Sequence, residues 1–256
     1  MKKKVVCDTW KMMNNYRDKL YAEYSTAFKG ADKNINLKEM ESYWPIFKYS
    51  VRNWLPKSEE VNIVDLGCGN GTIMSFLKNK EGYKNVFGVD ISESQIDLAK
   101  QHMPTAELGN ALEYLQKSSM KFDLILAFDV IEHLNKDEAL DLISLCYEKL
   151  NHGGRVIFQT PNASSPFFGV VRYGDFTHEL GFTPNLLSQL LTLYGFVNIE
   201  SRETGPLPYG YSLFSSIRYL AWQFLRTLLC LYSIIETGSC DDKIFTRVFI
   251  QSAIKK

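Results

Sequence analysis

The feature of this sequence that most constrains its fold is a series of short apolar runs separated by longer stretches with helical signals. The runs do not alternate between polar and apolar residues, which is typical of strands buried on both faces. Such strands belong to parallel sheets that helices cover on both sides. Four runs of this kind are present, at residues 62–66, 85–89, 122–128 and 155–160.

Capping residues mark the helices between and after these runs. The predicted helices run from Ser92 to His102, from a capping box at Asn135 and Glu138 to near residue 150, and from Thr183 and Pro184 to Gly195. Gly153 and Gly154 are expected to stop the second helix. Strands that alternate with helices at this spacing predict a doubly wound α/β sheet, which binds ligands beyond the carboxyl ends of its strands.

The composition favours a folded protein with a small partner. Of the 256 residues, 45% are hydrophobic, and 29 basic residues balance 29 acidic ones. The apolar content argues against an intrinsically disordered chain, and the balanced charge lacks the basic excess of a typical nucleic-acid binder. We therefore expect a small-molecule acceptor and no nucleic acid.

The cysteines give no sign of a disulfide framework or of a thiolate zinc site. Their number is odd, and no two have C-x-x-C spacing. They are Cys7, Cys68, Cys146, Cys230 and Cys240. Unpaired cysteines are typical of a reducing compartment, and the first residues lack the apolar core of a signal peptide. We expect a cytoplasmic protein.

A glycine-rich turn follows the first apolar run. Gly67 and Gly69 permit close approach of a ligand to the backbone, and Gly71 permits tight packing of strand and helix. Asp65, just before the glycines, would repel a pyrophosphate but can receive an ammonium group. Asp90 follows about 20 residues later, where an acid binds ribose hydroxyls. A ribose and an ammonium without phosphate fit S-adenosylmethionine, whereas NAD or a plain strand–helix turn leaves Asp65 without a role.

Residues 61–199 resemble the class I S-adenosylmethionine-dependent methyltransferases, with several motifs in order. The glycine-rich turn matches the first motif, residues 109–113 match the adenine-binding segment, and residues 122–134 match the fourth-strand motif. The resemblance implies a Rossmann-like sheet of seven strands, the last of them antiparallel. It implies that the cofactor is held by Asp65, Gly67, Cys68, Gly69, Asp90, Ile91, Asn110, Ala111, Phe128 and Asp129.

The catalytic candidates lie on the acceptor side, where residues 173–179 form a polar island. A hydroxyl acceptor must lose its proton during methyl transfer, so a base is needed. His178 is the first candidate, and Asp175 or Glu179 can orient it or raise its pKa. His133, after the fourth run, is the second. Both histidines can also serve only to fix their loops.

Two further interpretations concern the same region. Four side chains in this region are suitable metal ligands: Asp129, Asp175, His178 and Glu179. Their spacing does not match a specific metal-binding motif, so no metal is assigned. Residues 175–183 resemble an acceptor-side loop of methyltransferases that act on sugars and surface-glycan precursors.

Outside the motifs, the chain divides into residues 1–60, an aromatic helical lid, and residues 61–256, a methyltransferase domain with an acceptor-side insertion at about 161–240. Residues 213–235 of the insertion predict an amphipathic helix. Its two arginines argue against a membrane span. This helix can cover the active-site mouth, pair with a second subunit, or lie on a membrane surface.

These observations predict an S-adenosylmethionine-dependent O-methyltransferase that acts on a small polar acceptor. A sugar, a nucleotide-sugar or a capsule-type polysaccharide precursor is the expected acceptor. The alternatives are a phosphorylated or phosphoramidate group and a quinone-type phenol. The alternative from a different class of protein, one without enzymatic activity, is a non-catalytic S-adenosylmethionine-binding module.

Overall fold

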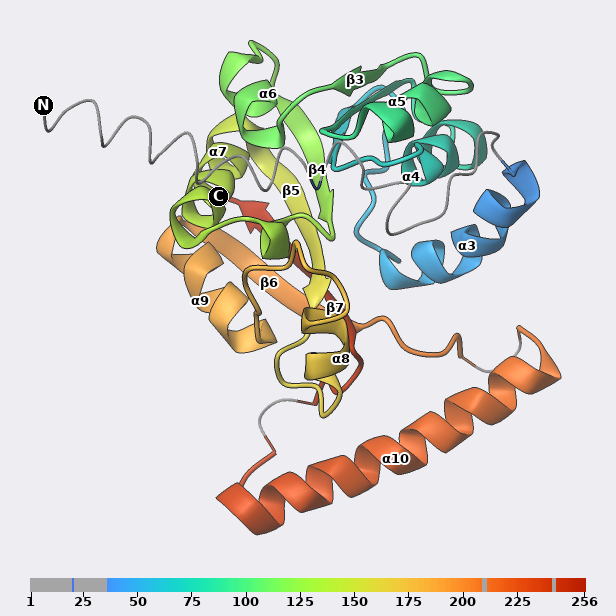
Figure 1. Cartoon of the computed structure of the whole chain (residues 1–256), viewed down its shortest axis with the longest axis vertical. Coiled ribbons are helices and arrows are strands. Elements are labelled where there is room, and N and C mark those ends of the chain that lie inside the picture. Colours follow the sequence, from blue (N-terminus) through green and yellow to red (C-terminus); the bar gives the residue numbers. More distant parts are fainter. Residues whose placement is uncertain (1–19, 21–35, 209–210, 241–242) are drawn as a thin grey trace, which may run out of the picture.

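The computed structural model describes residues 20, 36–208, 211–240 and 243–256. Their strands form one seven-stranded sheet in the order β3-β2-β1-β4-β5-β7-β6, in which β7 is antiparallel to both of its neighbours (Figure 1). The strands are β1 (Asn62–Leu66), β2 (Asn85–Asp90), β3 (Ala106–Leu108), β4 (Phe122–Phe128), β5 (Leu150–Pro161), β6 (Phe196–Glu203) and β7 (Val248–Lys255). The expected doubly wound sheet of seven strands, the last antiparallel, is confirmed.

Helices cover both faces of the sheet (Figure 1). One hydrophobic core joins α3, α4 and α5 to the sheet, and a second core joins α6, α7 and α9 to its other face. The described helices are α3 (Leu37–Ser50), α4 (Thr72–Ser75), the π-helical turn η1 (Phe76–Lys80), α5 (Glu93–Lys100), α6 (Ala111–Lys117), the 3-10 turn η2 (Ile131–His133), α7 (Lys136–Lys149), α8 (Phe168–Arg172), α9 (Pro184–Leu193) and α10 (Leu213–Thr237).

The central strand β4 shows why the apolar runs do not alternate. Leu124 and Leu126 belong to the core under α3, α4 and α5, whereas Ile125 and Ala127 belong to the core on the opposite face. All four side chains are fully buried. Burial of each larger side chain stabilises the fold by about 1.5–3 kcal/mol, so both faces of the strand favour apolar residues.

The capping box at the start of α7 is confirmed. The side chain of Asn135 accepts a hydrogen bond from the Glu138 N–H at 3.0 Å, and the Glu138 carboxylate accepts one from the Asn135 N–H at 2.8 Å. The predicted start of α9 is confirmed too, because the Thr183 hydroxyl accepts from the Leu186 N–H at 3.1 Å.

The predicted end of α7 near residue 150 is confirmed, but the expectation that Gly153 and Gly154 stop the helix was wrong. The helix ends at Lys149, and β5 starts at the next residue, so Gly153 and Gly154 lie inside a strand. Leu150 already pairs with Phe122 of β4. Pairing with β4 therefore ends the helix before the glycines are reached.

The helix α3 is the described part of the expected lid, and it is built into the core. Phe47 packs its ring against Phe76 and Phe128, with centroid distances of 5.1 and 5.6 Å. Trp54, just beyond the helix, is 3% exposed and donates a hydrogen bond to Glu200 of β6 at 2.8 Å. The other lid residues, 1–19 and 21–35, lie outside the described residues.

Cys230 and Cys240 form a disulfide, so the expectation that the cysteines are unpaired was wrong for this pair. Gly238 caps α10 in a left-handed conformation with φ of 83°, and this turn brings the following residues back beside the helix. The two Cα atoms are 5.5 Å apart. Cys68 and Cys146 are free and buried, and Cys7 lies outside the described residues.

The helix α10 runs along the lower edge of the molecule in Figure 1, away from the sheet, and its ends connect to β6 and β7. It has 25 residues, and none of them is buried. Its extent and amphipathic pattern agree with the expectation for residues 213–235. Within the part of the chain that the structure describes, no helix is both long and apolar enough to cross a membrane.

Candidate functional site

The carboxylate of Asp65 is buried at the carboxyl end of β1. Asp65 is 1% exposed, and neither of its side-chain oxygens has a hydrogen-bond partner. Burial, and then the charge of Asp90, raises the pKa of Asp65 to about 8. A buried carboxylate without donors is destabilising, and the ammonium of a ligand would supply donors and an opposite charge. The position therefore fits the ammonium-binding role expected for Asp65.

The glycine-rich turn after β1 has a left-handed backbone. Gly67, Gly69 and Gly71 have φ angles of 72°, 52° and 80°. A Cβ atom on Gly67 would lie 2.4 Å from Cγ2 of Val130. The Gly67 N–H also donates to the Val89 carbonyl of β2 at 2.8 Å. The turn is thus closed between two neighbouring strand ends, where a side chain at position 67 does not fit.

Asp90, at the end of β2, supports the same turn. One carboxylate oxygen accepts from the Gly69 N–H and the other from the Ser92 N–H, each at 2.8 Å. Each oxygen can accept a further bond, so the carboxylate can also bind ribose hydroxyls. The adjacent Ile91 has an exposed side chain and gives this corner an apolar surface.

Asn110 has a capping role that the sequence did not predict. Its side-chain oxygen accepts from the Leu112 and Glu113 N–H groups at 2.9 and 3.3 Å, and α6 begins there. The preceding Gly109 N–H donates to the Asp90 carbonyl at 2.9 Å. Asn110 and Ala111 are therefore held next to Asp90, where the resemblance expects the adenine segment.

The end of β4 joins the cofactor side of the site to α3. Phe128 is buried, and Asp129 has a positive φ of 54°. The Asp129 carboxylate accepts hydrogen bonds from the Gln159 amide at 3.0 and 3.2 Å. Tyr43 of α3 also interacts with Gln159, and partial burial together with the Asp129 charge raises its pKa. Tyr43 does not stand out in the sequence, because it is one of many aromatic residues in the lid.

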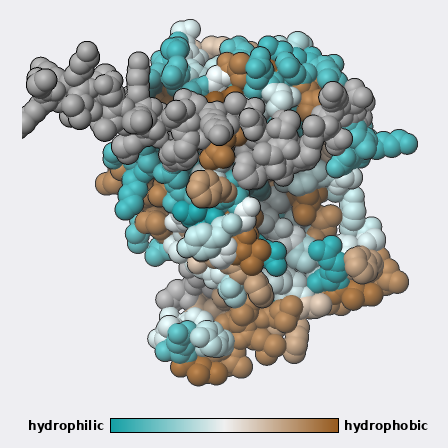
Figure 2. Space-filling model, viewed as in Figure 1, coloured by the Kyte–Doolittle hydropathy of each residue, from teal (hydrophilic) through white to brown (hydrophobic). Residues whose placement is uncertain are grey.

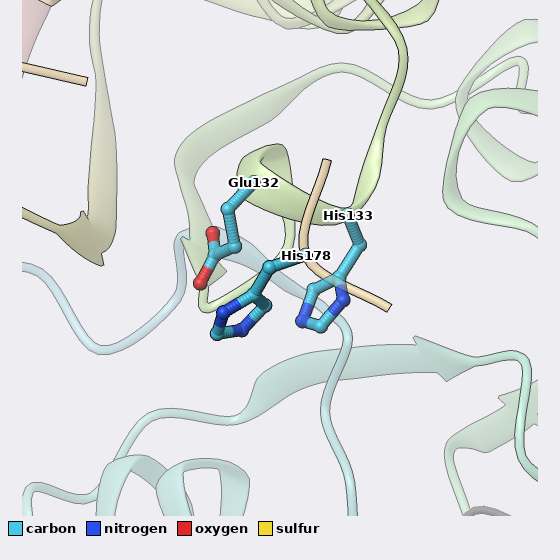
Figure 3. A group of neighbouring side chains, drawn as sticks. All are labelled: Glu132, His133 and His178. Carbon is cyan, nitrogen blue, oxygen red and sulfur yellow. The ribbon is translucent and has the colours of Figure 1, made fainter. Parts of the chain in front are cut away.

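Three side chains converge beyond the carboxyl end of β4: Glu132, His133 and His178 (Figure 3). Glu132 and His133 lie on η2, and His178 lies in the loop between α8 and α9. One potential ligand atom of each residue lies within 4.8 Å of the others. The two imidazole rings meet edge to face, with 4.7 Å between centroids. The two histidines singled out in the sequence are thus neighbours.

Backbone hydrogen bonds hold the loop of His178 against η2. The carbonyl of Glu132 accepts from the N–H groups of Glu179 and Leu180 at 2.7 and 2.9 Å. The Arg172 guanidinium donates to the Glu179 carbonyl at 3.1 Å. These bonds bring His178 to the cluster although 45 residues of sequence separate it from His133.

The hydrogen bonds of both histidines leave their Nε2 atoms as acceptors. His178 Nδ1 lies 3.0 Å from the Val171 carbonyl, which can only accept, so Nδ1 carries the proton. His133 Nδ1 lies 2.8 Å from the Thr177 hydroxyl, and that hydroxyl donates to Asp175 at 2.6 Å. The Thr177 oxygen therefore accepts from His133 Nδ1–H. In each ring Nε2 is therefore the nitrogen that carries a lone pair, the kind of atom that binds a cation or a proton.

The sequence had suggested that Asp175 or Glu179 orients His178. In the structure the Val171 carbonyl binds His178, and Asp175 reaches His133 through Thr177. The reason is local: Asp175 closes a turn by accepting from the Thr177 N–H at 2.9 Å. This turn directs the Thr177 hydroxyl to η2.

Glu132 is the member of the cluster that sequence reasoning missed. It is fully buried; one carboxylate oxygen accepts from the Thr160 hydroxyl at 3.1 Å, and the other has no partner. Burial, and then the charge of Asp129, raises its pKa well above the usual value. An acid within the apolar sequence after β4 was the available signal. Of the four metal ligands weighed in the sequence analysis, His178 belongs to this described cluster.

A pocket of about 570 Å³ opens next to the cluster. It is lined by Arg172, Tyr173, Asp175, Phe176 and His178. Tyr173 and Phe176 are 83% and 77% exposed, so the pocket offers two aromatic surfaces to a ligand. The polar island of residues 173–179 thus forms a wall of the candidate acceptor site.

Comparison with known proteins identifies the family. The family model described as "Methyltransferase domain" matches residues 30–201. A ubiquinone biosynthesis O-methyltransferase of Coxiella burnetii is 32% identical over 106 residues, which cover 40% of this chain and 44% of the relative. A small RNA 2'-O-methyltransferase of Rattus norvegicus is 25% identical over 190 residues, 65% of this chain and 48% of the relative. The chain thus spans less than half the length of these relatives.

Solved structures share the fold at low sequence identity. A SAM-dependent methyltransferase from Archaeoglobus fulgidus has a TM-score of 0.61 at 20% identity and covers 91% of this chain and 98% of its own. Magnesium protoporphyrin IX methyltransferase from Synechocystis, with bound S-adenosylhomocysteine, has a TM-score of 0.55 at 15% identity and covers 95% and 100%. The chain therefore belongs to the methyltransferase-domain family and has the class I fold of the S-adenosylmethionine-dependent methyltransferases.

Proposed function

We propose that the protein is an O-methyltransferase in which Glu132, His133 and His178 bind the acceptor hydroxyl through a divalent cation. The observation that carries this proposal is the convergence of one carboxylate and two imidazole rings, with one potential ligand atom of each residue within 4.8 Å of the others. The two relatives compared with this chain are O-methyltransferases, which supports oxygen as the methylated atom.

S-adenosylmethionine supplies the methyl group, as an electrophilic carbon on a sulfonium. The chain contributes the binding groups. Asp65 faces the ammonium, and Asp90 faces the ribose. The left-handed glycine turn allows the ligand to approach the backbone closely. These groups lie at the carboxyl ends of β1 and β2, the edge where ligands bind in doubly wound sheets.

The donor set favours a first-row transition ion such as Mn²⁺ or Zn²⁺ over Ca²⁺, because two imidazoles and one carboxylate are offered. A cation at this position would lower the pKa of a bound hydroxyl and so make its oxygen a better nucleophile. It would also offset the cost of the buried Glu132 carboxylate. The second possibility for the same residues is a direct proton transfer to His178 or His133.

For the acceptor we propose a phenol-type hydroxyl. The exposed Tyr173 and Phe176 rings of the pocket favour an aromatic ring, and the relatives include ubiquinone biosynthesis O-methyltransferases. The sugar or surface-glycan acceptor remains the second candidate, which Arg172 and Asp175 in the pocket wall favour. The relatives also include small RNA 2'-O-methyltransferases, so the balanced charge of the chain does not exclude a nucleic-acid acceptor.

Metal titration and activity together test the proposal. Mn²⁺ binding to the metal-free protein, measured by electron paramagnetic resonance, should be lost in Glu132→Gln and retained in Asp137→Asn, a matched change of an acid in the first turn of α7. Methyl transfer from labelled S-adenosylmethionine to a dihydroxybenzoate, a nucleotide-sugar and a short RNA should be highest for the phenol. Full activity after removal of metal with a chelator would exclude the cation and leave the histidine base.

A further inference from the structure

We propose that the apolar face of α10 binds the surface of an anionic lipid bilayer. The helix is attached to the molecule by its polar side. Trp222 and Arg226 interact with the Glu203 carboxylate at 3.0 and 3.4 Å, and the Ser215 hydroxyl donates to the Leu207 carbonyl at 3.0 Å. The Cys230–Cys240 disulfide fixes the far end of the helix on its half-buried side.

The opposite side of α10 is apolar and exposed, which is the reverse of an ordinary surface helix. Figure 2 shows hydrophobic residues gathered along the lower edge of the molecule, where Figure 1 places α10. The exposed side chains, each between 45% and 80% accessible, are Leu213, Phe214, Ile217, Leu220, Phe224, Leu225, Leu228, Leu231, Tyr232, Ile234 and Ile235. A patch of this size on one element indicates a binding partner.

The shape of this face favours a flat apolar phase over a second helix. Its central residues are Leu213, Ile217, Leu220, Phe224, Leu228, Leu231 and Ile235. Their steps of three or four residues average about 3.7, above the 3.5 of a left-handed coiled coil, so the stripe stays straight along the helix. At about 100° per residue the exposed apolar side chains cover about half of the circumference, wider than a coiled-coil seam.

The charges around the face complement anionic lipid. Within α10 the charged residues are Arg218, Arg226 and Glu236, and Arg226 pairs with the Glu203 carboxylate at 3.4 Å. Arg218 is exposed at the border of the apolar face, with its guanidinium 5.9 Å from the Phe214 ring centroid. Cations next to inserted aromatic rings are the arrangement of helices that lie in a membrane interface.

Vesicle flotation of the full chain tests the proposal. The wild type should float with vesicles of phosphatidylglycerol and phosphatidylcholine, and less with phosphatidylcholine alone. Because insertion of each large apolar side chain strengthens partition by about 10-fold or more, Phe224→Glu and Leu228→Glu should each weaken binding at least about 10-fold. Gln223→Glu, which adds the same charge outside the apolar face, should bind within about 2-fold of the wild type.

Two controls separate lipid binding from loss of the fold and from dimer formation. All variants should bind S-adenosylmethionine as the wild type does in calorimetry, because α10 is exposed and its substitution leaves the sheet intact. Light scattering reports the oligomeric state. A dimer that Leu228→Glu dissociates, in a protein that does not float, would assign the face to a second copy and overturn the proposal. Equal flotation of Leu228→Glu and wild type would overturn it as well.

Discussion

The buried carboxylate of Asp65 makes the stability of the cofactor-free protein depend on pH. Its pKa is about 8 when folded and near 4 when unfolded, so between these values the folded state binds more protons and stability falls as the pH rises. The shift corresponds to ~5 kcal/mol of stability lost between pH 4 and pH 8, whereas a buried amide has no charged form and keeps the same cost at both pH values.

We therefore expect Asp65→Asn to raise the free energy of unfolding by ~5 kcal/mol at pH 8 and by little near pH 4. The same variant should weaken S-adenosylmethionine binding, because the carboxylate that faces the ammonium is gone. Denaturant unfolding and calorimetry at both pH values provide the measurements. An Asp65→Asn protein that is less stable than the wild type at pH 8 would contradict the unpartnered state of this carboxylate.

Position 67 requires glycine for two reasons: the left-handed backbone, and the close contact that any larger side chain would make with Val130. Gly67→Ala adds a Cβ atom 2.4 Å from Val130, whereas Gly153→Ala, at a similar φ of 76°, meets nothing within 4 Å. The strain of a left-handed backbone is shared by both and costs about 1–2 kcal/mol. We expect Gly67→Ala to lose a further ~1–3 kcal/mol in urea unfolding. Equal losses would show that Val130 moves away without cost.

At the scale of single elements, the turn of residues 175–177 positions His133. Thr177→Val removes the hydroxyl between Asp175 and His133 while keeping the side-chain shape. Loss of such an outer hydrogen bond typically costs 10–100-fold in metal affinity or activity. We expect about that decrease in kcat, a shifted pH profile and unchanged cofactor affinity.

The matched control for Thr177→Val is Thr192→Val. This variant loses a side-chain hydrogen bond to the Ser188 carbonyl on the exposed side of α9, away from the site. It should leave kcat and the pH profile unchanged. If Thr177→Val lowered only the melting temperature, with kcat intact, the turn would have a purely structural role.

Elements with a purely local cause could be predicted from the sequence. The capping box of α7 depends on Asn135 and Glu138 alone, and the apolar run of β4 on burial at both faces. The early start of β5 at Leu150, before the two glycines, could not, because it is set by pairing of Leu150 with Phe122, a contact between segments. The pairing of Cys230 with Cys240 likewise depends on the turn at Gly238.

The site shows the same division. Asp65 and Asp90 lie in the last residues of β1 and β2, and the glycines follow β1 directly, so their place in the fold could be read from sequence. Glu132 gave a weaker signal, an acid within the apolar sequence after β4, and its burial beside the two histidines is seen only in the structure. The periodicity of α10 predicts an amphipathic helix, but only the structure shows that the polar side faces the molecule.

At the scale of the whole molecule, α3 and the sheet form one core, whereas α10 is attached to it without burying a residue. The two elements should therefore respond differently to the same substitution. Phe47 is 2% exposed and contacts Phe76 and Phe128, and Phe224 is 65% exposed. Removal of a buried phenylalanine side chain costs about 3–5 kcal/mol, whereas an exposed one costs about 0.5 kcal/mol or less.

We expect Phe47→Ala to lower the free energy of unfolding by about 3–5 kcal/mol and Phe224→Ala to leave it within about 0.5 kcal/mol. Tryptophan fluorescence and far-ultraviolet circular dichroism should report a single transition for Phe47→Ala, because α3 and the sheet share one core. An earlier, separate transition would mean that α3 opens as an independent lid. In that case the contact of Tyr43 with Gln159 at the end of β4 would open together with α3.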